Sequence, residues 1–114
     1  MSFNDTMKRL RIEYLHSLPL KMTQLEKSFF HNDLGCLRED FHKLKGTGKT
    51  YGFPEISELS EVVERVLIDR PQTYSQVVPE AIGILSDIYR ALATSRSFDL
   101  ASDGRFREIR ALTL

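Results

Sequence analysis

Residues 41–54 read Phe-His-Lys-Leu-Lys-Gly-Thr-Gly-Lys-Thr-Tyr-Gly-Phe-Pro, and this stretch decides the fold. It continues a pattern of apolar residues at steps of three, four and three: Leu34, Leu37, Phe41 and Leu44. Such steps place all four side chains on one face of a helix. His42 lies about 100° around the helix from Phe41, so it borders the apolar face. The stretch therefore predicts an amphipathic helix with an imidazole beside its buried side.

Cationic side chains recur around His42 at helical spacing. Arg38 lies four residues before it, and Lys45 and Lys49 lie three and seven residues after it. Gly46, one turn after the histidine, has no side chain and leaves open space. A neutral imidazole is a nucleophile near neutral pH, and neighbouring cations would stabilise a dianionic phosphoryl product. This pattern suits a nucleophile that carries a phosphoryl group.

The composition indicates one soluble, cytoplasmic domain. The 114 residues are enough for one hydrophobic core. Sixteen basic and sixteen acidic side chains balance, which argues against a nucleic-acid binder and against a polybasic membrane anchor. The single Cys36 cannot form an internal disulfide, which fits a reducing compartment. No apolar run is long enough to span a bilayer, and the N-terminus lacks the pattern of a signal peptide.

The N-terminal segment has helical periodicity that a proline interrupts. Asn4 or Asp5 can cap its start. The apolar positions before the proline are Met7, Leu10, Tyr14 and Leu18, and those after it are Met22, Leu25 and Phe29. Pro19 is tolerated in the first turn of a new helix. The segment is therefore either two helices or one kinked helix. We favour two, with an additional N-terminal helix over residues 4–18 that lies across the end or side of a bundle.

Three further helical segments follow. Gly52 fits the left-handed end of the histidine helix, and Pro54 fits the first turn of a helix that runs to about residue 69. The last long helix begins near residue 73 or 75, where Pro79 requires either a late start or a kink. We expect an all-α, up-and-down four-helix bundle over residues 1–96. Residues 97–114 are a loose tail or a short helix around Phe106, Ile109 and Leu112.

Several other patterns are interpreted as structural. Glu55, Glu58, Glu61 and Glu64 line one edge of the helix after Pro54, and we interpret this run as a solvated face. Gly48-Lys49-Thr50 resembles the end of a phosphate-binding P-loop. That motif also requires a glycine at position 43, which is lysine here, and a strand before the loop, which this sequence does not predict. His31, Cys36 and His42 do not share a helix face, so no metal site is expected.

The sequence His42-Lys43-Leu44-Lys45-Gly46 resembles the signature of histidine-containing phosphotransfer (HPt) domains. Gly52, ten positions after the histidine, and the amphipathic helix that follows extend the resemblance from about Leu34 to Val66. The resemblance implies that Lys45 lies near the phosphoryl group and that Gly46 keeps the imidazole reachable. For Arg38 and Lys49, helical spacing alone suggests the same phosphoryl-stabilising role, and ordinary solvated charges explain them equally well.

The resemblance implies a stand-alone carrier of a two-component phosphorelay. By this resemblance, His42 would accept a phosphoryl group at Nε2 from the phosphoaspartate of a response-regulator receiver domain. A second receiver would then accept the group from His42. A hybrid histidine kinase is the expected upstream partner. The chain has no ATP-binding domain, so no autokinase activity is expected. No cofactor is expected either, because the acidic pocket of the receiver would supply Mg²⁺.

Two other functions remain open. The same bundle can be a non-catalytic binding module that sequesters a response regulator or a kinase. It can also be a helical interaction protein with a chance motif, which would bind no receiver. Substitution of His42 separates these alternatives, because only the carrier needs the nucleophile.

Overall fold

The computed structural model describes residues 2–113, and helices account for most of them. The α-helices are α1 (Phe3–Phe30), α2 (Leu34–Thr50), α3 (Pro54–Asp69), α4 (Tyr74–Ala93) and α5 (Gly104–Ala111). Two short 3₁₀ turns, Pro71–Thr73 and Leu100–Ser102, precede α4 and α5. Within the described residues there is no β-strand. The expected all-α class is confirmed.

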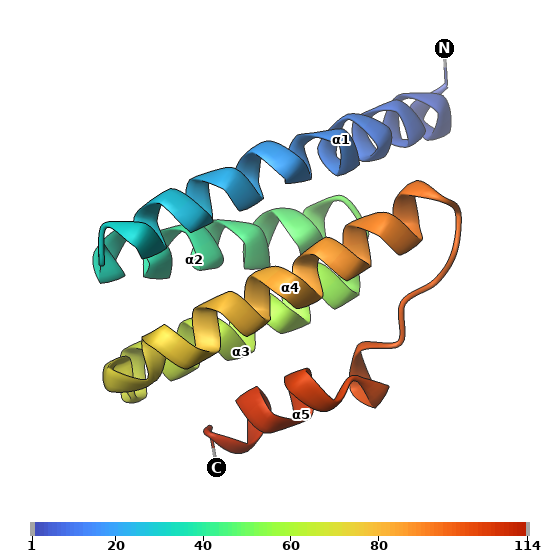
Figure 1. Cartoon of the computed structure of the whole chain (residues 1–114). Helices are drawn as coiled ribbons and strands as arrows, with labels where there is room; N and C mark the ends of the chain where they lie inside the picture. The colour runs from blue at the N-terminus through green and yellow to red at the C-terminus, as the bar shows by residue number, and fades with distance from the viewer. Residues whose placement is uncertain (1, 114) are drawn as a thin grey trace.

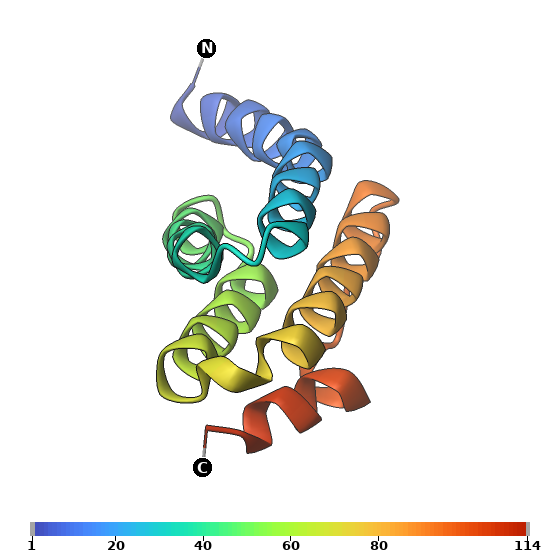
Figure 2. The same ribbon diagram turned by 60° about the vertical axis from the view of Figure 1, so that its left-hand side comes forward.

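The first four helices form an up-and-down bundle (Figure 1). Viewed closer to the helix axes, α2 lies between α1 and α3, and α4 closes the ring between α3 and α1 (Figure 2). The short α5 packs on the outside against α3 and α4. None of the described helices is both long enough and apolar enough to cross a bilayer.

A single hydrophobic core receives side chains from all five helices. Leu18, Phe41, Val63, Ile88 and Phe106 come from α1 to α5 in turn, and each is fully buried. Burial of one such side chain stabilises the fold by about 1.5–3 kcal/mol. The apolar positions with helical spacing are therefore the positions that hold the bundle together.

The expectation of two helices in the N-terminal segment is wrong, because α1 runs without a break through Pro19. A proline inside a helix removes one hydrogen bond and costs about 3 kcal/mol. Here Tyr14 and Leu18 before the proline, and Met22 and Leu25 after it, are buried against the same core. Their shared burial offsets the cost, and the proline ring itself is exposed. Figure 2 shows the curvature expected of a helix with an internal proline.

The helix ends partly follow the sequence signals. Ser2 caps α1, its side chain accepting from the Asp5 nitrogen, so the expected cap at Asn4 or Asp5 is wrong. Asp33 caps α2, and its side chain accepts a hydrogen bond from the Cys36 nitrogen at 3.0 Å. Gly52 has φ of +81°, the left-handed conformation expected after α2.

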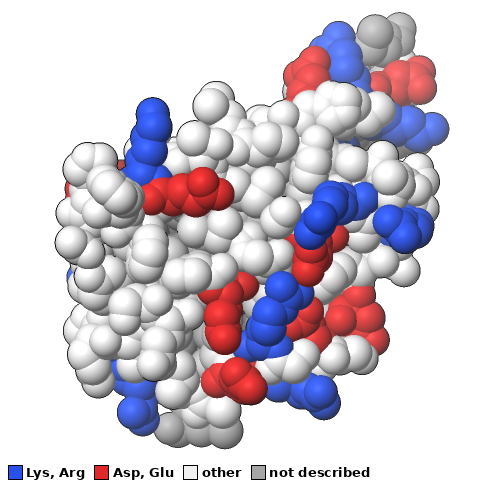
Figure 3. Space-filling view, in the orientation of Figure 1, with Lys and Arg blue, Asp and Glu red and all other residues white. Residues whose placement is uncertain are grey.

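The C-terminal segment is the short helix α5, so the loose-tail alternative is wrong. Phe106 and Ile109 are buried in the common core. Asp103 caps α5, and Arg105 donates to Asp87 of α4 at 2.8 Å, which fixes α5 to the bundle. Figure 3 shows charged side chains of both signs interspersed on one face of the molecule, mainly over its right-hand half. The split at residue 96 into bundle and tail stays a prediction.

Candidate functional site

The site centres on the outer surface of α2. Leu37, Phe41 and Leu44 anchor the helix in the core, and each is buried. His42 follows Phe41 by one residue, so its side chain lies beside the buried face and is 69% exposed. The predicted position of the imidazole at the border of the apolar face is confirmed.

The two interior glycines of α2 have different surroundings. A Cβ atom at Gly48 would lie 2.9 Å from the Ser57 nitrogen and 3.2 Å from the Phe53 oxygen. The glycine therefore allows the backbone of α2 to approach the start of α3. Ser57 reinforces this approach, since its hydroxyl donates to the Lys45 carbonyl at 2.7 Å. At Gly46, in contrast, no atom outside the local helical backbone lies within 4 Å of the Cβ position, so the space beside it is open.

The close approach of α2 and α3 brings a carboxylate to the imidazole. Nδ1 of His42 lies 2.7 Å from Oε2 of Glu64 on α3. The Glu64 side chain is only 17% exposed, so the bond is partly shielded from water. A carboxylate can only accept, so we assign the proton of this hydrogen bond to Nδ1. In the neutral ring, Nε2 then carries the free lone pair.

The glutamate run on α3 is not uniformly solvated. Glu58 and Glu61 are exposed, as expected. Glu64 is half-buried against His42, which corrects the interpretation of this residue as part of a solvated face. Glu55 is also half-buried, and burial raises the pKa of its carboxyl, although a backbone hydrogen bond and Arg11 oppose the shift.

A signal for Glu64 was present in the sequence. His42 lies ten residues before Gly52, and Glu64 lies twelve residues after it. In an antiparallel helical hairpin that turns at Gly52, these two positions are at nearly the same height. The hairpin register therefore indicates residues near position 64 as neighbours of the imidazole, whereas spacing along one helix does not.

The predicted cations all lie on α2 at the expected spacing from His42. Lys45 is half-buried, and Arg38 and Lys49 are exposed. Among the described residues, no carboxylate lies within ion-pair distance of any of the three. Lys43, in contrast, is 3.4 Å from Glu39. The phosphoryl-stabilising role of Arg38, Lys45 and Lys49 stays a prediction.

The apparent P-loop residues belong to a regular helix. Gly48 and Lys49 are in the last turn of α2, and the Thr50 hydroxyl donates to the Gly46 carbonyl at 3.0 Å. A P-loop instead needs a strand, a glycine-rich loop and a free hydroxyl. Within residues 2–113, no group of three or more His, Cys, Asp or Glu side chains is placed to hold a metal ion.

Comparison with protein-family models shows that residues 9–101 match the Hpt domain. The chain belongs to the Hpt domain family. The match begins within α1, covers α2 to α4 and ends before α5. Comparisons with the curated proteins and with the solved structures give no significant match.

Hpt domains perform histidine phosphotransfer in two-component signalling, and this is the functional class of the chain. Their partners are receiver domains and histidine kinases of phosphorelays. In this chain the helical bundle carries an exposed imidazole at His42, and the space beside Gly46 on the same helix is open.

Proposed function

We propose that His42 is the phosphoryl acceptor of this Hpt domain. Nε2 attacks the phosphorus of a phosphoaspartate on a receiver domain. The N–P bond forms as the acyl-phosphate O–P bond breaks, and the aspartate leaves as a carboxylate. The observation that supports this proposal most directly is the 2.7 Å contact between Nδ1 and Glu64, which directs the lone pair of Nε2 outwards.

Glu64 would act as the partner of the charge that develops on the ring. Nδ1 keeps its proton during the attack, so the phosphorylated imidazole is a cation. A carboxylate already hydrogen-bonded to Nδ1 stabilises that cation and needs little reorganisation. Transfer to a second receiver reverses these steps and restores the neutral ring.

Lys45, Arg38 and Lys49 would stabilise the phosphoryl group itself. Phosphoryl transfer depends mainly on positioning and on neutralisation of charge. None of the three cations forms an ion pair with a carboxylate of the described residues. They are therefore available to a dianionic phosphoryl group on His42 of the same helix. Mg²⁺ would come from the acidic pocket of the receiver.

The docking surface would lie over α2 and α3 around the imidazole. Gly46 leaves room for a partner to approach His42. Ile68 lies one turn after Glu64 on the same face of α3, and it is 48% exposed. An apolar contact at Ile68 beside the cations of α2 fits a receiver surface that combines apolar and acidic residues. The cytoplasmic location of the protein and its role as a stand-alone carrier stay predictions.

The experiment that tests the proposal is transfer from radiolabelled, phosphorylated receivers to the wild-type protein and to His42→Gln. His31→Gln is the matched control, because His31 is also exposed but lies in the turn after α1. We expect label on the wild type and on the control, but not on His42→Gln. Phosphohistidine is labile in acid and stable in base, so the label should be lost only in acid.

Other outcomes assign a different function. Receivers that bind without transferring label would indicate the sequestering module. Label that remains on His42→Gln would place the acceptor elsewhere. The absence of binding to any receiver would indicate that this member of the family has lost the relay activity.

A further inference from the structure

A groove lies between the N-terminal half of α1 and the C-terminal end of α4, which separate towards the top of Figure 2. Its volume is about 500 Å³. Apolar side chains from α1, the turn before α3 and α4 line it: Ile12, Leu15, Phe53 and Leu92. Ile12 is 56% exposed, although it is a large apolar residue. Apolar surface with a polar rim is typical of sites that bind a partner.

Three cationic side chains line the same groove. Lys8 and Arg11 lie one turn apart on α1, and Arg96 follows the end of α4. All three are exposed, and none forms an ion pair with a carboxylate of the described residues. No Asp or Glu of residues 2–113 lines the groove. The groove therefore presents positive charge on both sides without a carboxylate at ion-pair distance.

The two guanidinium groups are held by contacts within the chain. The Arg11 guanidinium lies 5.1 Å from the centre of the Phe53 ring, which is a cation–π contact. Burial raises the pKa of the Glu55 carboxyl and Arg11 opposes this shift, but the two side chains form no ion pair. Nε of Arg96 donates to the Thr94 hydroxyl at 3.0 Å, which leaves its NH₂ groups to a partner. Groups positioned in advance lose less entropy when a partner binds.

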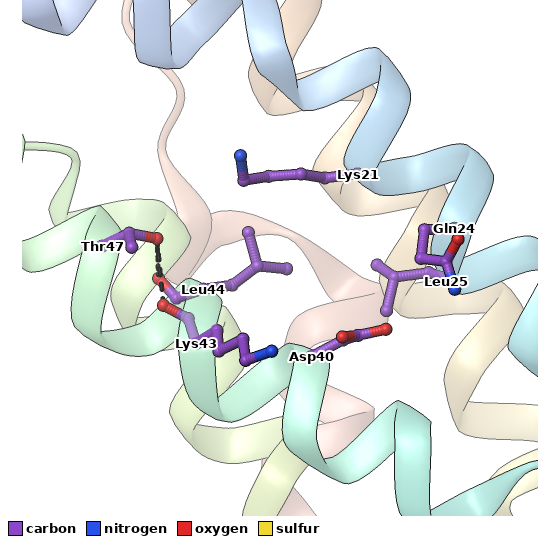
Figure 4. A pocket seen from close by; sticks show the side chains of 7 residues that line it. All are labelled: Lys21, Gln24, Leu25, Asp40, Lys43, Leu44 and Thr47. Carbon is purple, nitrogen blue, oxygen red and sulfur yellow. Dashed lines mark hydrogen bonds between the residues drawn. The ribbon is translucent and has the colours of Figure 1, made fainter.

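The hollow between α1 and α2 differs from this groove (Figure 4). It is smaller, with a volume of about 270 Å³, and the side chains of Leu25 and Leu44 project into it. Lys43 at its edge is 3.4 Å from Glu39. Its lining is almost entirely apolar, so it does not select an occupant by charge. The groove between α1 and α4 does.

We propose that the groove between α1 and α4 binds an acidic peptide segment of a partner protein, anchored by a bulky apolar residue. The apolar residue packs on Ile12 and Phe53. Carboxylates on either side of it pair with Lys8 and Arg11 across one edge and with Arg96 across the other. Arginine suits this role because its planar fork donates two parallel hydrogen bonds to one carboxylate. An open groove fits a peptide better than a small molecule, which usually needs an enclosed site.

The proposed site is separate from the histidine site. His42 contacts Glu64 on the α2–α3 side of the ring of helices, whereas the groove lies on the α1–α4 side. Peptide binding does not depend on phosphotransfer by His42, so the failure of one proposal leaves the other standing. His42→Gln should bind the peptide as the wild type does.

The test is a titration of the full chain with the synthetic peptide Glu-Asp-Leu-Phe-Glu-Glu, acetylated and amidated at its ends and followed by backbone amide signals in NMR spectra. One matched peptide carries Gln and Asn in place of Glu and Asp, and another carries Ser in place of Leu and Phe. We expect saturable shifts of the groove residues at peptide concentrations up to about 1 mM, which covers micromolar affinity. Both matched peptides should bind more weakly, and added salt should weaken binding of the acidic peptide.

Lys8→Gln and Arg96→Gln test the assigned charges from the two sides of the groove. Each should lower the affinity for the acidic peptide about three- to tenfold, because a charge-assisted contact is lost. Arg9→Gln is the matched control, since Arg9 is an exposed cation of α1 that does not line the groove and lies 3.8 Å from Glu13. It should bind nearly as the wild type does.

Ile12→Ser tests the apolar contact. Its affinity for the acidic peptide should be about three- to tenfold lower, because the exposed side chain no longer gains burial on binding. Leu20→Ser is the matched control, since Leu20 is 76% exposed on the same helix and does not line the groove. Urea unfolding of each variant shows whether the fold is retained, so a loss of binding can be assigned to the groove.

Five results would overturn the proposal. Three concern the peptide: no saturable shifts with the acidic sequence, equal affinity for the peptide without carboxylates, and unchanged affinity in both Lys8→Gln and Arg96→Gln. Binding to phosphatidylserine vesicles without binding to the peptide would assign the groove to a membrane surface. Shifts of the groove signals on dilution of the chain alone would assign it to a second copy of the chain.

Discussion

Gly48→Ala should destabilise the bundle, whereas Gly46→Ala on the same helix should stabilise it. The added methyl group at Gly48 would lie 2.9 Å from the Ser57 nitrogen and 3.2 Å from the Phe53 oxygen. Both are backbone atoms, so α3 must move as a unit to make room. At Gly46 the methyl group would meet nothing outside its own helical backbone.

The magnitude follows from a comparison of the two variants. Each replaces an interior helical glycine by alanine, which favours the helix by about 1 kcal/mol. This gain cancels in the difference, which isolates the cost of forcing the helices apart. Overpacking of this kind costs about 1–3 kcal/mol. The free energy of unfolding of Gly48→Ala should therefore be about 1–3 kcal/mol lower than that of Gly46→Ala. Each kcal/mol corresponds to a decrease of roughly 3–6 °C in Tm for a domain of this size.

The assay is urea unfolding of both variants and the wild type, followed by far-UV circular dichroism. Equal slopes of the unfolding free energy against urea concentration would show that all three proteins expose the same amount of surface on unfolding. Gly46→Ala should unfold at the highest urea concentration and Gly48→Ala at the lowest. If Gly48→Ala is as stable as Gly46→Ala, the close approach of α2 and α3 is not the reason for the glycine.

Three further substitutions test other parts of the structure. Glu64→Ala should slow phosphoryl transfer to His42 several-fold. It should also shift the ring from the Nδ1-protonated tautomer towards the Nε2-protonated one, which the imidazole ¹⁵N chemical shifts report. An unchanged tautomer would contradict the assigned contact. Arg105→Ala should lower the free energy of unfolding by about 0–1 kcal/mol, because the ion pair with Asp87 is partly exposed. Arg105 lowers the pKa of Asp87, so the contact stabilises the fold above the ordinary carboxyl pKa of about 4 and is lost as pH falls through the lower folded-state pKa. Arg105→Ala should accordingly show a smaller loss of stability in acid than the wild type, and an equal loss would contradict this account. Pro19→Ala should raise the free energy of unfolding by about 1–3 kcal/mol, because α1 regains a hydrogen bond. Thermal or urea unfolding measures the change. A decrease would show that the curvature of α1 is required for packing.

The sequence was sufficient to predict the elements whose signals are local. The spacing of Leu37, Phe41 and Leu44 predicted α2, and all three are buried as expected. Gly52 predicted a left-handed residue after α2, because few other residues adopt a positive φ without strain. The same spacing placed the imidazole of His42 correctly beside the core.

Features that depend on contacts between helices were missed. Pro19 suggested a helix boundary because the local cost of proline is known, whereas the compensating burial of Leu18 and Met22 depends on the neighbouring helices. Glu64 was assigned to a solvated face because its own helix gives no sign of a partner. Only the register of α2 against α3 shows that its carboxylate meets His42.

The hydrogen bond between His42 and Glu64 joins the two helices of one hairpin, and this has a thermodynamic consequence. Under the proposed function, phosphorylation converts a neutral donor into a cationic one, so the bond strengthens and the hairpin becomes harder to open. Linkage is reciprocal, so a hairpin that opens less easily also favours the phosphorylated ring. The amide hydrogens of α2 and α3 should then exchange more slowly when His42 carries the phosphoryl group. Residues that set the spacing of the hairpin, such as Gly48, thereby influence how long the phosphorylated state persists.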